Sequence, residues 1–139
     1  MAVGLMTAPV VYGLFVVYWN IVVFRPFYNT RKHLTFADFQ KEFEGSSFRR
    51  EAIEFAYQDL TGVAGYPILR SDHLWSTLHL HPDEVEDATD KRLMEMGIDN
   101  ICWTVPIDTV EDCVGFWSYV LGAIEDGSVQ PAHSEPGVT

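Results

Sequence analysis

The hydrophobic and polar positions divide the chain into an uncharged N-terminal segment and a series of amphipathic segments behind it. Residues 3–24 carry no charged side chain. A helix of that length reaches about 33 Å, which is enough to cross a hydrocarbon core of roughly 30 Å. Tyr18 and Trp19 lie toward its C-terminal end, where aromatic side chains favour the headgroup layer. The pattern predicts a transmembrane helix that meets the lipid bilayer through residues 3–24.

A cleaved signal peptide and a buried core helix are the two alternatives for this segment. A signal peptide would have basic residues ahead of its apolar run, whereas the first basic residue here is Arg25. Arg25, Arg31 and Lys32 all follow the run, so the positive-inside rule predicts an N-terminus outside and a cytoplasmic C-terminal domain. We therefore expect a single-pass protein of the cell membrane.

Two amphipathic helices are predicted next. Thr35 and Asp38 resemble a capping box for a short helix, and Ser46 or Ser47 is placed to cap a longer helix that Gly62 ends. The apolar positions at helical spacing are Phe36, Phe39 and Phe43 in the first and Phe48, Ala52, Phe55, Ala56 and Leu60 in the second. We expect the first helix to pack against the domain or to lie in the headgroup layer.

Two more helices are predicted in the second half of the chain. Pro82 suits the first position of a helix that Gly97 ends, and Asp108 with Glu111 forms a capping box for a last helix that ends at Gly127. Their apolar stripes are Val85, Ala88, Leu93 and Met96, and then Val110, Val114, Trp117, Leu121 and Ile124. We expect Trp75, Trp103 and Trp117 in the core.

The charges change along the chain. Residues 25–50 contain six Lys/Arg against three Asp/Glu, whereas residues 51–139 contain three Lys/Arg against 17 Asp/Glu, and the net charge is −11. Nucleic-acid affinity depends on cationic contacts to phosphate, so an acidic domain excludes nucleic acid as a partner. The same charge favours a basic protein partner.

Cys102 and Cys113 are too few for a disulfide framework. One bridge between them is an alternative, but a cytoplasmic domain predicts two reduced, largely buried thiols.

Three motifs in the second half follow a known order. They are S-D-H-L-W-S-T-L over residues 71–78, L-H-L-H-P-D leading to M-G-I over residues 78–98, and T-V-E-D-C-V over residues 109–114. In this order and spacing, residues 48–125 resemble an acyl carrier protein, a small acidic four-helix bundle. The resemblance implies an acidic second helix at residues 82–96 that serves as the docking surface for basic partner enzymes.

The carrier's phosphopantetheine serine is missing from this motif. Its Asp-Ser pair is replaced by His81 and Pro82, and proline has no side-chain nucleophile. The chain thus resembles bacterial carrier-like proteins that keep the bundle without the serine, which implies no cofactor. A true acyl carrier with an atypical attachment site at Ser71 or Ser76 is an alternative.

The fold expectation is therefore all-α: an acyl-carrier-like four-helix bundle preceded by an N-terminal transmembrane helix and a short amphipathic helix. The expected parts are a transmembrane anchor (1–24), a basic juxtamembrane linker with the short helix (25–47), the bundle (48–126) and a disordered tail (127–139).

His73, His79 and His81, with Asp83, are the one candidate metal cluster, and they also contain the candidate acid/base groups. His79 and His81 flank Leu80 in an irregular turn, so polar residues at a helix entry, with His81 near the N-cap, are the preferred interpretation. No partnered nucleophile or oxyanion site is visible, so we expect no metal site and no enzyme activity.

The remaining candidate site is a set of acids on the helix that begins at Pro82. Its members are Asp83, Glu84, Glu86, Asp87 and Asp90. Such a run is often simply a solvated face. The resemblance favours a membrane-tethered, non-catalytic interaction module that docks a basic partner there. A structural accessory subunit of a membrane complex, with Gly4, Ala8 and Gly13 at a helix interface, is the alternative.

Overall fold

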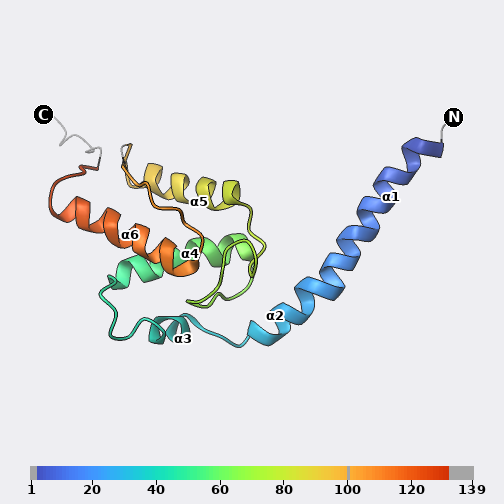
Figure 1. Cartoon of the computed structure of the whole chain (residues 1–139), viewed down its shortest axis with the longest axis horizontal. Coiled ribbons are helices and arrows are strands. Elements are labelled where there is room, and N and C mark those ends of the chain that lie inside the picture. Colours follow the sequence, from blue (N-terminus) through green and yellow to red (C-terminus); the bar gives the residue numbers. More distant parts are fainter. Residues whose placement is uncertain (1–2, 100, 132–139) are drawn as a thin grey trace, which may run out of the picture. The chain divides into compact units, whose positions relative to one another are not determined.

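The computed structural model describes residues 3–99 and 101–131, and these residues form an all-α protein (Figure 1). The elements are α1 (Val3–Tyr18), the π-helix η1 (Trp19–Phe24), α2 (Arg25–Arg31), α3 (Phe36–Lys41), α4 (Arg50–Ala64), α5 (Pro82–Glu95) and α6 (Val110–Glu125). Because α1, η1 and α2 follow one another without a break, the described residues form five separate helices. They contain no strand, only an isolated bridge between His73 and Thr109.

The chain separates into two compact units with their boundary between His33 and Leu34. The first unit contains α1, η1 and α2. Its segment Thr7–Arg31 is one continuous helix, long and apolar enough to cross a membrane, and none of its most apolar stretch is buried. Cleaved N-terminal signal sequences also meet this requirement of length and composition.

A π-helical turn interrupts the apolar helix just before Pro26. The backbone N–H of Arg25 donates to the carbonyl of Asn20, five residues back. Proline has no N–H to donate and its ring crowds the carbonyl four residues before it, so the wider turn accommodates Pro26 inside the helix. Helix therefore extends through α2 to Arg31, within the segment expected to be a juxtamembrane linker.

The core of the second unit lies between α4 and α6. These helices pack against each other, and α4 also contacts α3 and α5. The buried residues of α4 are Ala52, Ile53, Ala56 and Leu60. Those of α6 are Val110, Cys113, Val114, Phe116, Trp117, Val120 and Ala123. The apolar stripe predicted for α6 is therefore buried at Val110, Val114 and Trp117, and half-buried at Leu121 and Ile124.

Two arginines connect the helices across the unit. Arg92 on α5 forms a bidentate ion pair with Asp59 on α4, with nitrogen to oxygen distances of 2.6–2.9 Å, and its guanidinium lies 4.4 Å from the centre of the Phe55 ring. Arg70 pairs with both carboxylate oxygens of Glu111 at 3.0 and 3.1 Å. These contacts bind α5 to α4 and bind the long α4–α5 loop to α6.

The Arg70 contact makes the stability of the fold depend on pH. The hydrogen bond from Arg70 holds the pKa of Glu111 below its ordinary value. A carboxyl group whose pKa falls on folding stabilises the native state above its unfolded pKa. That contribution is lost as the pH falls through the lowered value of the folded state.

Two helix limits differ from the predicted ones because of tertiary contacts. Helix α4 continues past Gly62 to Gly65, which takes the left-handed conformation at φ 78°. The next residue, Tyr66, is buried and its hydroxyl donates to the Leu78 carbonyl at 3.0 Å, so packing sets the end of the helix. Neither Ser46 nor Ser47 is the cap, since the N-cap residue of α4 is Arg49.

The capping box of α6 is shifted by one residue from the predicted position. It joins Thr109 and Asp112, whereas the prediction was Asp108 and Glu111. The carboxylate of Glu111 is taken by Arg70, which leaves Asp112 to accept the N–H groups of the cap. In contrast, the capping boxes of α3 (Thr35 with Asp38) and the limits of α5 agree with the sequence pattern.

The region expected to be a four-helix bundle contains three α-helices, because the described residues between α5 and α6 form an extended connection. In the first part of this connection Ile101 and Trp103 are half-buried, whereas Cys102 and Thr104 are exposed; Val105 and Pro106 are exposed as well. Extended backbone sends successive side chains to opposite sides. The expectation that Cys102 is buried is therefore wrong, and burial of Cys113 is confirmed.

The three tryptophans expected in the core differ in their burial. Trp117 is fully buried, Trp103 is half-buried, and Trp75 is 58% exposed, so its expected place in the core is wrong. Trp75 belongs to an irregular turn outside the α4–α6 core. Of the expected disordered tail, residues 132–139 lie outside the described residues.

We predict that Asp59→Asn lowers the free energy of unfolding by about 2 kcal/mol, because it removes one partner of a largely buried ion pair. The measurement is urea unfolding of the full chain in micelles, followed by tryptophan fluorescence. Asp90→Asn is the control, since Asp90 is exposed and should change this free energy by less than about 0.5 kcal/mol. Equal effects of the two substitutions would contradict the role given to the Arg92 contact.

We also predict that one thiol reacts with a thiol reagent in the native protein. Cys102 is exposed, whereas burial raises the pKa of Cys113 to about 12, so its reactive thiolate is scarce and inaccessible. Cys102→Ser should therefore abolish the native reaction, and denaturant should restore reactivity through Cys113. Two thiols reacting at similar rates before denaturation would show that the packing around Cys113 is wrong.

Candidate functional site: an apolar groove beside acidic helix α5

Helix α5 begins with a capping box that its sequence supplies. Pro82 occupies the first turn, where its missing N–H has no intrahelical partner to lose. The backbone N–H of His81 donates to Glu84 Oε2 at 2.8 Å, and His81 Nδ1 accepts from the backbone N–H of Asp83 at 3.2 Å. The cap fixes the direction of α5, and one residue of the helix, Val85, is buried.

His81 Nδ1 has a second contact, with the Asp83 carboxylate, that requires a different protonation state from the capping hydrogen bond. Its Nδ1 lies 3.4 Å from Asp83 Oδ2, which is an ion pair only when the imidazole is protonated. A nitrogen that accepts the Asp83 N–H carries no proton, so the capping contact belongs to neutral imidazole with its proton on Nε2.

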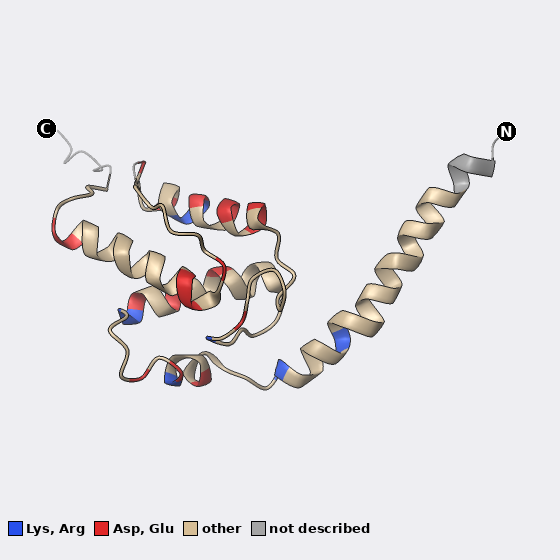
Figure 2. Cartoon of the chain, in the orientation of Figure 1, with Lys and Arg blue, Asp and Glu red and all other residues tan. Residues whose placement is uncertain are grey.

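The five predicted acids are all exposed, and Figure 2 shows acidic residues following one another along α5. They do not form one equivalent set. Asp83 and Glu84 lie at the helix entry, with Glu84 engaged in the capping box. Glu86, Asp87 and Asp90 take part in no ion pair among the residues that the structure describes. These three carboxylates are the ones available to a partner.

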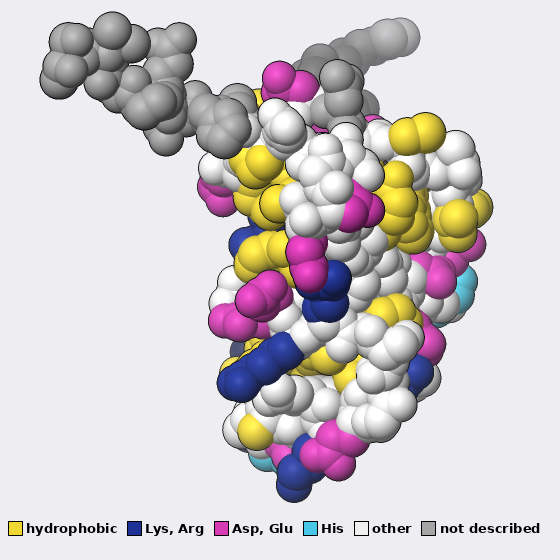
Figure 3. Space-filling model, turned by 90° about the vertical axis from the view of Figure 1, so that its left-hand side faces the viewer, with side chains coloured by type: hydrophobic (Ala, Val, Ile, Leu, Met, Phe, Trp, Pro, Cys, Tyr) yellow, Lys and Arg dark blue, Asp and Glu magenta, His cyan; other side chains and the backbone are white. Residues whose placement is uncertain are grey.

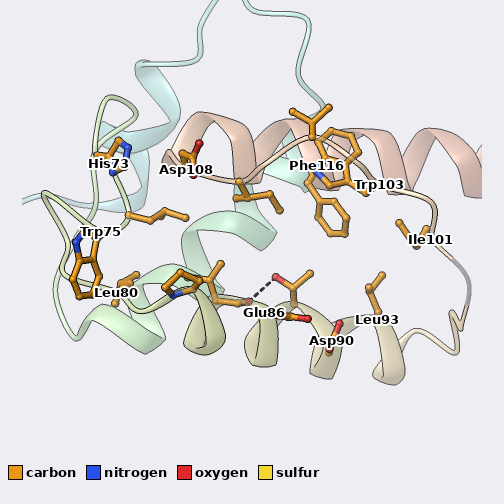
Figure 4. A pocket seen from close by; sticks show the side chains of 16 residues that line it. His73, Trp75, Leu80, Glu86, Asp90, Leu93, Ile101, Trp103, Asp108 and Phe116 are labelled. Carbon is orange, nitrogen blue, oxygen red and sulfur yellow. Dashed lines mark hydrogen bonds between the residues drawn. The ribbon is translucent and has the colours of Figure 1, made fainter.

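A groove of about 480 Å³ runs beside this helix. Figure 4 shows α5 along one side and the connection Ile101–Asp108, with α6 behind it, along the other. The apolar lining from α5 is Pro82, Val85 and Leu93, and that from the opposite side is Ile101, Trp103, Val105, Ile107 and Phe116. The volume lies within the range of roughly 300–1,000 Å³ that is usual for ligand sites.

Carboxylates line both sides of the groove. Glu86 and Asp90 lie one turn apart on α5, and Asp108 lies on the opposite side (Figure 4). No Lys or Arg is among the described residues that line it. The groove therefore combines an apolar interior with a negative rim.

Main-chain hydrogen bonds hold the end of the groove where His73 and Leu74 lie. The Leu74 N–H donates to the Asp108 carbonyl at 2.8 Å, and the Val110 N–H donates to the Asp72 carbonyl at 3.0 Å. Asp72 is itself buried. These bonds join the α4–α5 loop to the start of α6, so the two sides of the groove are fixed at this end.

Aromatic contacts hold the side formed by the connection. The Trp103 ring lies edge-on to Phe116 with centroids 5.4 Å apart and lies 5.3 Å from the Tyr119 centroid. Trp103 Nε1 is buried and has no hydrogen-bond partner among the described residues. Trp103 thus belongs to the groove and packs it against α6.

The three candidate histidines are not assembled into a ligand set. His73 lies at the end of the groove, His79 is exposed in a left-handed conformation at φ 55°, and His81 caps α5. No group of three or more His, Cys, Asp or Glu side chains suited to a metal ion occurs in the described part of the chain.

Sequence reasoning missed Asp108 as a site residue and missed the groove itself. A usable signal was present, because Ile101, Trp103, Val105 and Ile107 are apolar at every second position and all four line the groove. Period-two alternation indicates an extended segment with one apolar face. The residues across from it, on α5, are brought there only by the fold.

Comparisons with known proteins find similarity to a small part of an enzyme. No family model and no solved structure matches the chain. The alanine–tRNA ligase of Nitrosomonas europaea is 41% identical over 71 residues, which are 50% of this chain and 8% of the ligase. The alanine–tRNA ligase of Sulfurimonas denitrificans is 32% identical over 80 residues, 53% of this chain and 9% of the ligase. The chain thus spans less than a tenth of the length of these curated relatives.

We predict that His81→Ala lowers the free energy of unfolding by about 1 kcal/mol, because the N–H of Asp83 loses its acceptor at the helix start. His81→Asp is the matched control, since aspartate caps helices well and should retain most of the stability. Chemical unfolding followed by circular dichroism measures both variants. Equal losses for alanine and aspartate would show that the His81 ring acts through something other than capping.

Proposed function

We propose that the protein is a membrane-tethered, non-catalytic interaction module that docks a basic protein partner through the outer face of α5. The observation that carries this proposal is the exposure of Glu86, Asp87 and Asp90, none of which has an ion-pair partner among the described residues. Exposed charges of one sign steer and select a partner of the opposite sign. Such a contact weakens as salt rises, because exposed charges are screened.

The surface elsewhere supports the choice of α5. On the side of the molecule shown in Figure 3, acidic, basic and apolar side chains are interspersed. Two other exposed acids are engaged locally: Glu125 pairs with Arg49, and Asp126 accepts from Ser128, a contact that lowers the pKa of Asp126. Helix α5 offers three unpaired carboxylates within two turns.

The N-terminal helix supports a membrane location for this module. Residues 7–22 are all exposed, and their apolar side chains are suited to lipid. Under the proposed topology the N-terminus lies outside and the second unit lies in the cytoplasm, where Arg25 and Lys32 meet the anionic leaflet. Anchoring raises the local concentration of the module, so a weak electrostatic contact suffices.

The carrier resemblance supports the same face without supporting carrier activity. In that family the second helix is the docking surface, and here it is the acidic helix α5. Pro82 at its start offers no atom for a phosphodiester. We also propose no aminoacylation activity, because the segment shared with alanine–tRNA ligases is under a tenth of each enzyme.

A structural accessory subunit of a membrane complex is the second candidate, and the exposed apolar helix favours it. A side chain added at Gly13 would meet no atom within 4 Å, so this small surface is open to another helix. The π-turn of η1 lies in the same helix, and such turns occur frequently at functional sites.

We expect the variant Glu86→Lys/Asp87→Lys/Asp90→Lys to lose at least about tenfold of partner capture. The experiment is a pull-down of the full chain from gently solubilised native membranes, with partners identified by mass spectrometry. The variant Glu44→Lys/Glu51→Lys/Asp99→Lys has the same net charge and changes exposed acids that do not line the groove, so it should retain the partner. About 0.5 M salt should release the partner from the native chain.

Two results would contradict the α5 proposal. Retention of the partner by the α5 variant would show that these acids do not dock it. Loss of the partner on Gly13→Leu, with the α5 variant unaffected, would instead favour the accessory subunit. A version that begins at Thr35 separates the two candidates further, because only docking through α5 survives removal of the anchor.

A further inference from the structure

We propose that the groove between α5 and residues 101–108 receives the apolar face of a basic amphipathic helix from the partner. This inference rests on the proposed docking function and adds the chemistry of the occupant. Apolar side chains of that helix enter the groove, and its Lys or Arg side chains meet Glu86, Asp90 and Asp108.

The shape of the groove fits a helix. Its lining on α5 extends from Pro82 to Leu93, which is about 16 Å along the axis, or about three helical turns. A helix of similar length presents apolar anchors at i, i+4 and i+7 to such a groove. Trp75 and Val105 line the groove and are 58% and 56% exposed, so apolar surface is open to a partner.

The charges decide which apolar occupant fits. Glu86 and Asp90 flank the groove on one side and Asp108 on the other, and all three are exposed. A fatty acid would bring its own carboxylate to this negative rim, and an uncharged chain would leave the rim unpaired. A cationic helix pairs the rim and fills the interior together.

The probes are two synthetic peptides of about 14 residues, near the length at which isolated helices begin to form. The first carries lysines on one face and leucines at i, i+4 and i+7 on the other. The second keeps every lysine and replaces the leucines with glutamine. Dodecanoate is a third probe for a lipid-like occupant.

The readout is fluorine NMR of the full chain in phosphatidylcholine nanodiscs, with 5-fluorotryptophan in place of its four tryptophans. Trp75 and Trp103 line the groove and should shift with the leucine peptide. Trp19 lies in η1 and is the internal control, whereas the ring of Trp117 lies 5.1 Å from that of Phe116, which lines the groove, so its signal is not used as a control. Empty nanodiscs give the background of peptide bound to lipid.

We expect the leucine peptide to bind at least about tenfold more tightly than the glutamine peptide, since each buried leucine contributes to affinity. Thr89→Phe, which fills the groove, should remove this advantage while leaving the acids in place. Val105→Gln is the second groove variant. Because Val105 is 56% exposed, this substitution should leave the stability of the fold unchanged.

The outcomes separate the inference from the function on which it rests. If both peptides bind equally and Glu86→Gln/Asp90→Asn weakens both, docking by charge stands and the groove inference is overturned. If neither peptide binds, or the acidic substitutions change nothing, both fail. Shifts of Trp103 by dodecanoate at lower concentrations than the leucine peptide would assign the groove to a lipid-like ligand and overturn the inference.

Discussion

The ion pair between Arg92 and Asp59 is the constraint on which the candidate site depends. Helix α5 has one buried residue, Val85, so apolar packing alone gives it little hold on the rest of the unit. The guanidinium of Arg92 binds the Asp59 carboxylate and lies over Phe55, which joins α5 to the main α4–α6 core. Hydrogen bonding to Asp59 raises the pKa of Arg92, so the pair stays charged. This attachment leaves the other apolar side of α5 unfilled.

The unfilled side becomes a groove because the segment facing it is extended. A helix at residues 101–108 would direct apolar side chains around its axis, whereas the extended chain directs Ile101, Trp103, Val105 and Ile107 to one side. Trp103 rests on Phe116 and so holds this side at a distance from α5. A polar attachment at one face of α5 and an extended wall opposite the other thus create an apolar space with an acidic rim.

The start of α5 uses its residues for helix capping. His81 is the N-cap and Pro82 lies in the first turn, so both residues are used to begin the helix. Proline removes one unsatisfied N–H, and the imidazole accepts another from Asp83. His81 and Pro82 therefore stabilise the start of the helix, and the acids Glu86, Asp87 and Asp90 that follow are exposed.

The sequence by itself determined the helices and their polarity. Local rules were sufficient for Thr35 and Asp38 at α3, for Pro82 and Gly97 around α5, and for the acidic residues of α5, because capping and periodicity act within a few residues.

Only the tertiary structure decided that Glu111 pairs with Arg70, which shifted the cap of α6, and that Tyr66 sets the end of α4. It also decided that Trp75 is exposed and that Asp108 faces Glu86 across a groove. These features join residues far apart in the chain. A local sequence pattern does not determine which distant side chain will form a given contact.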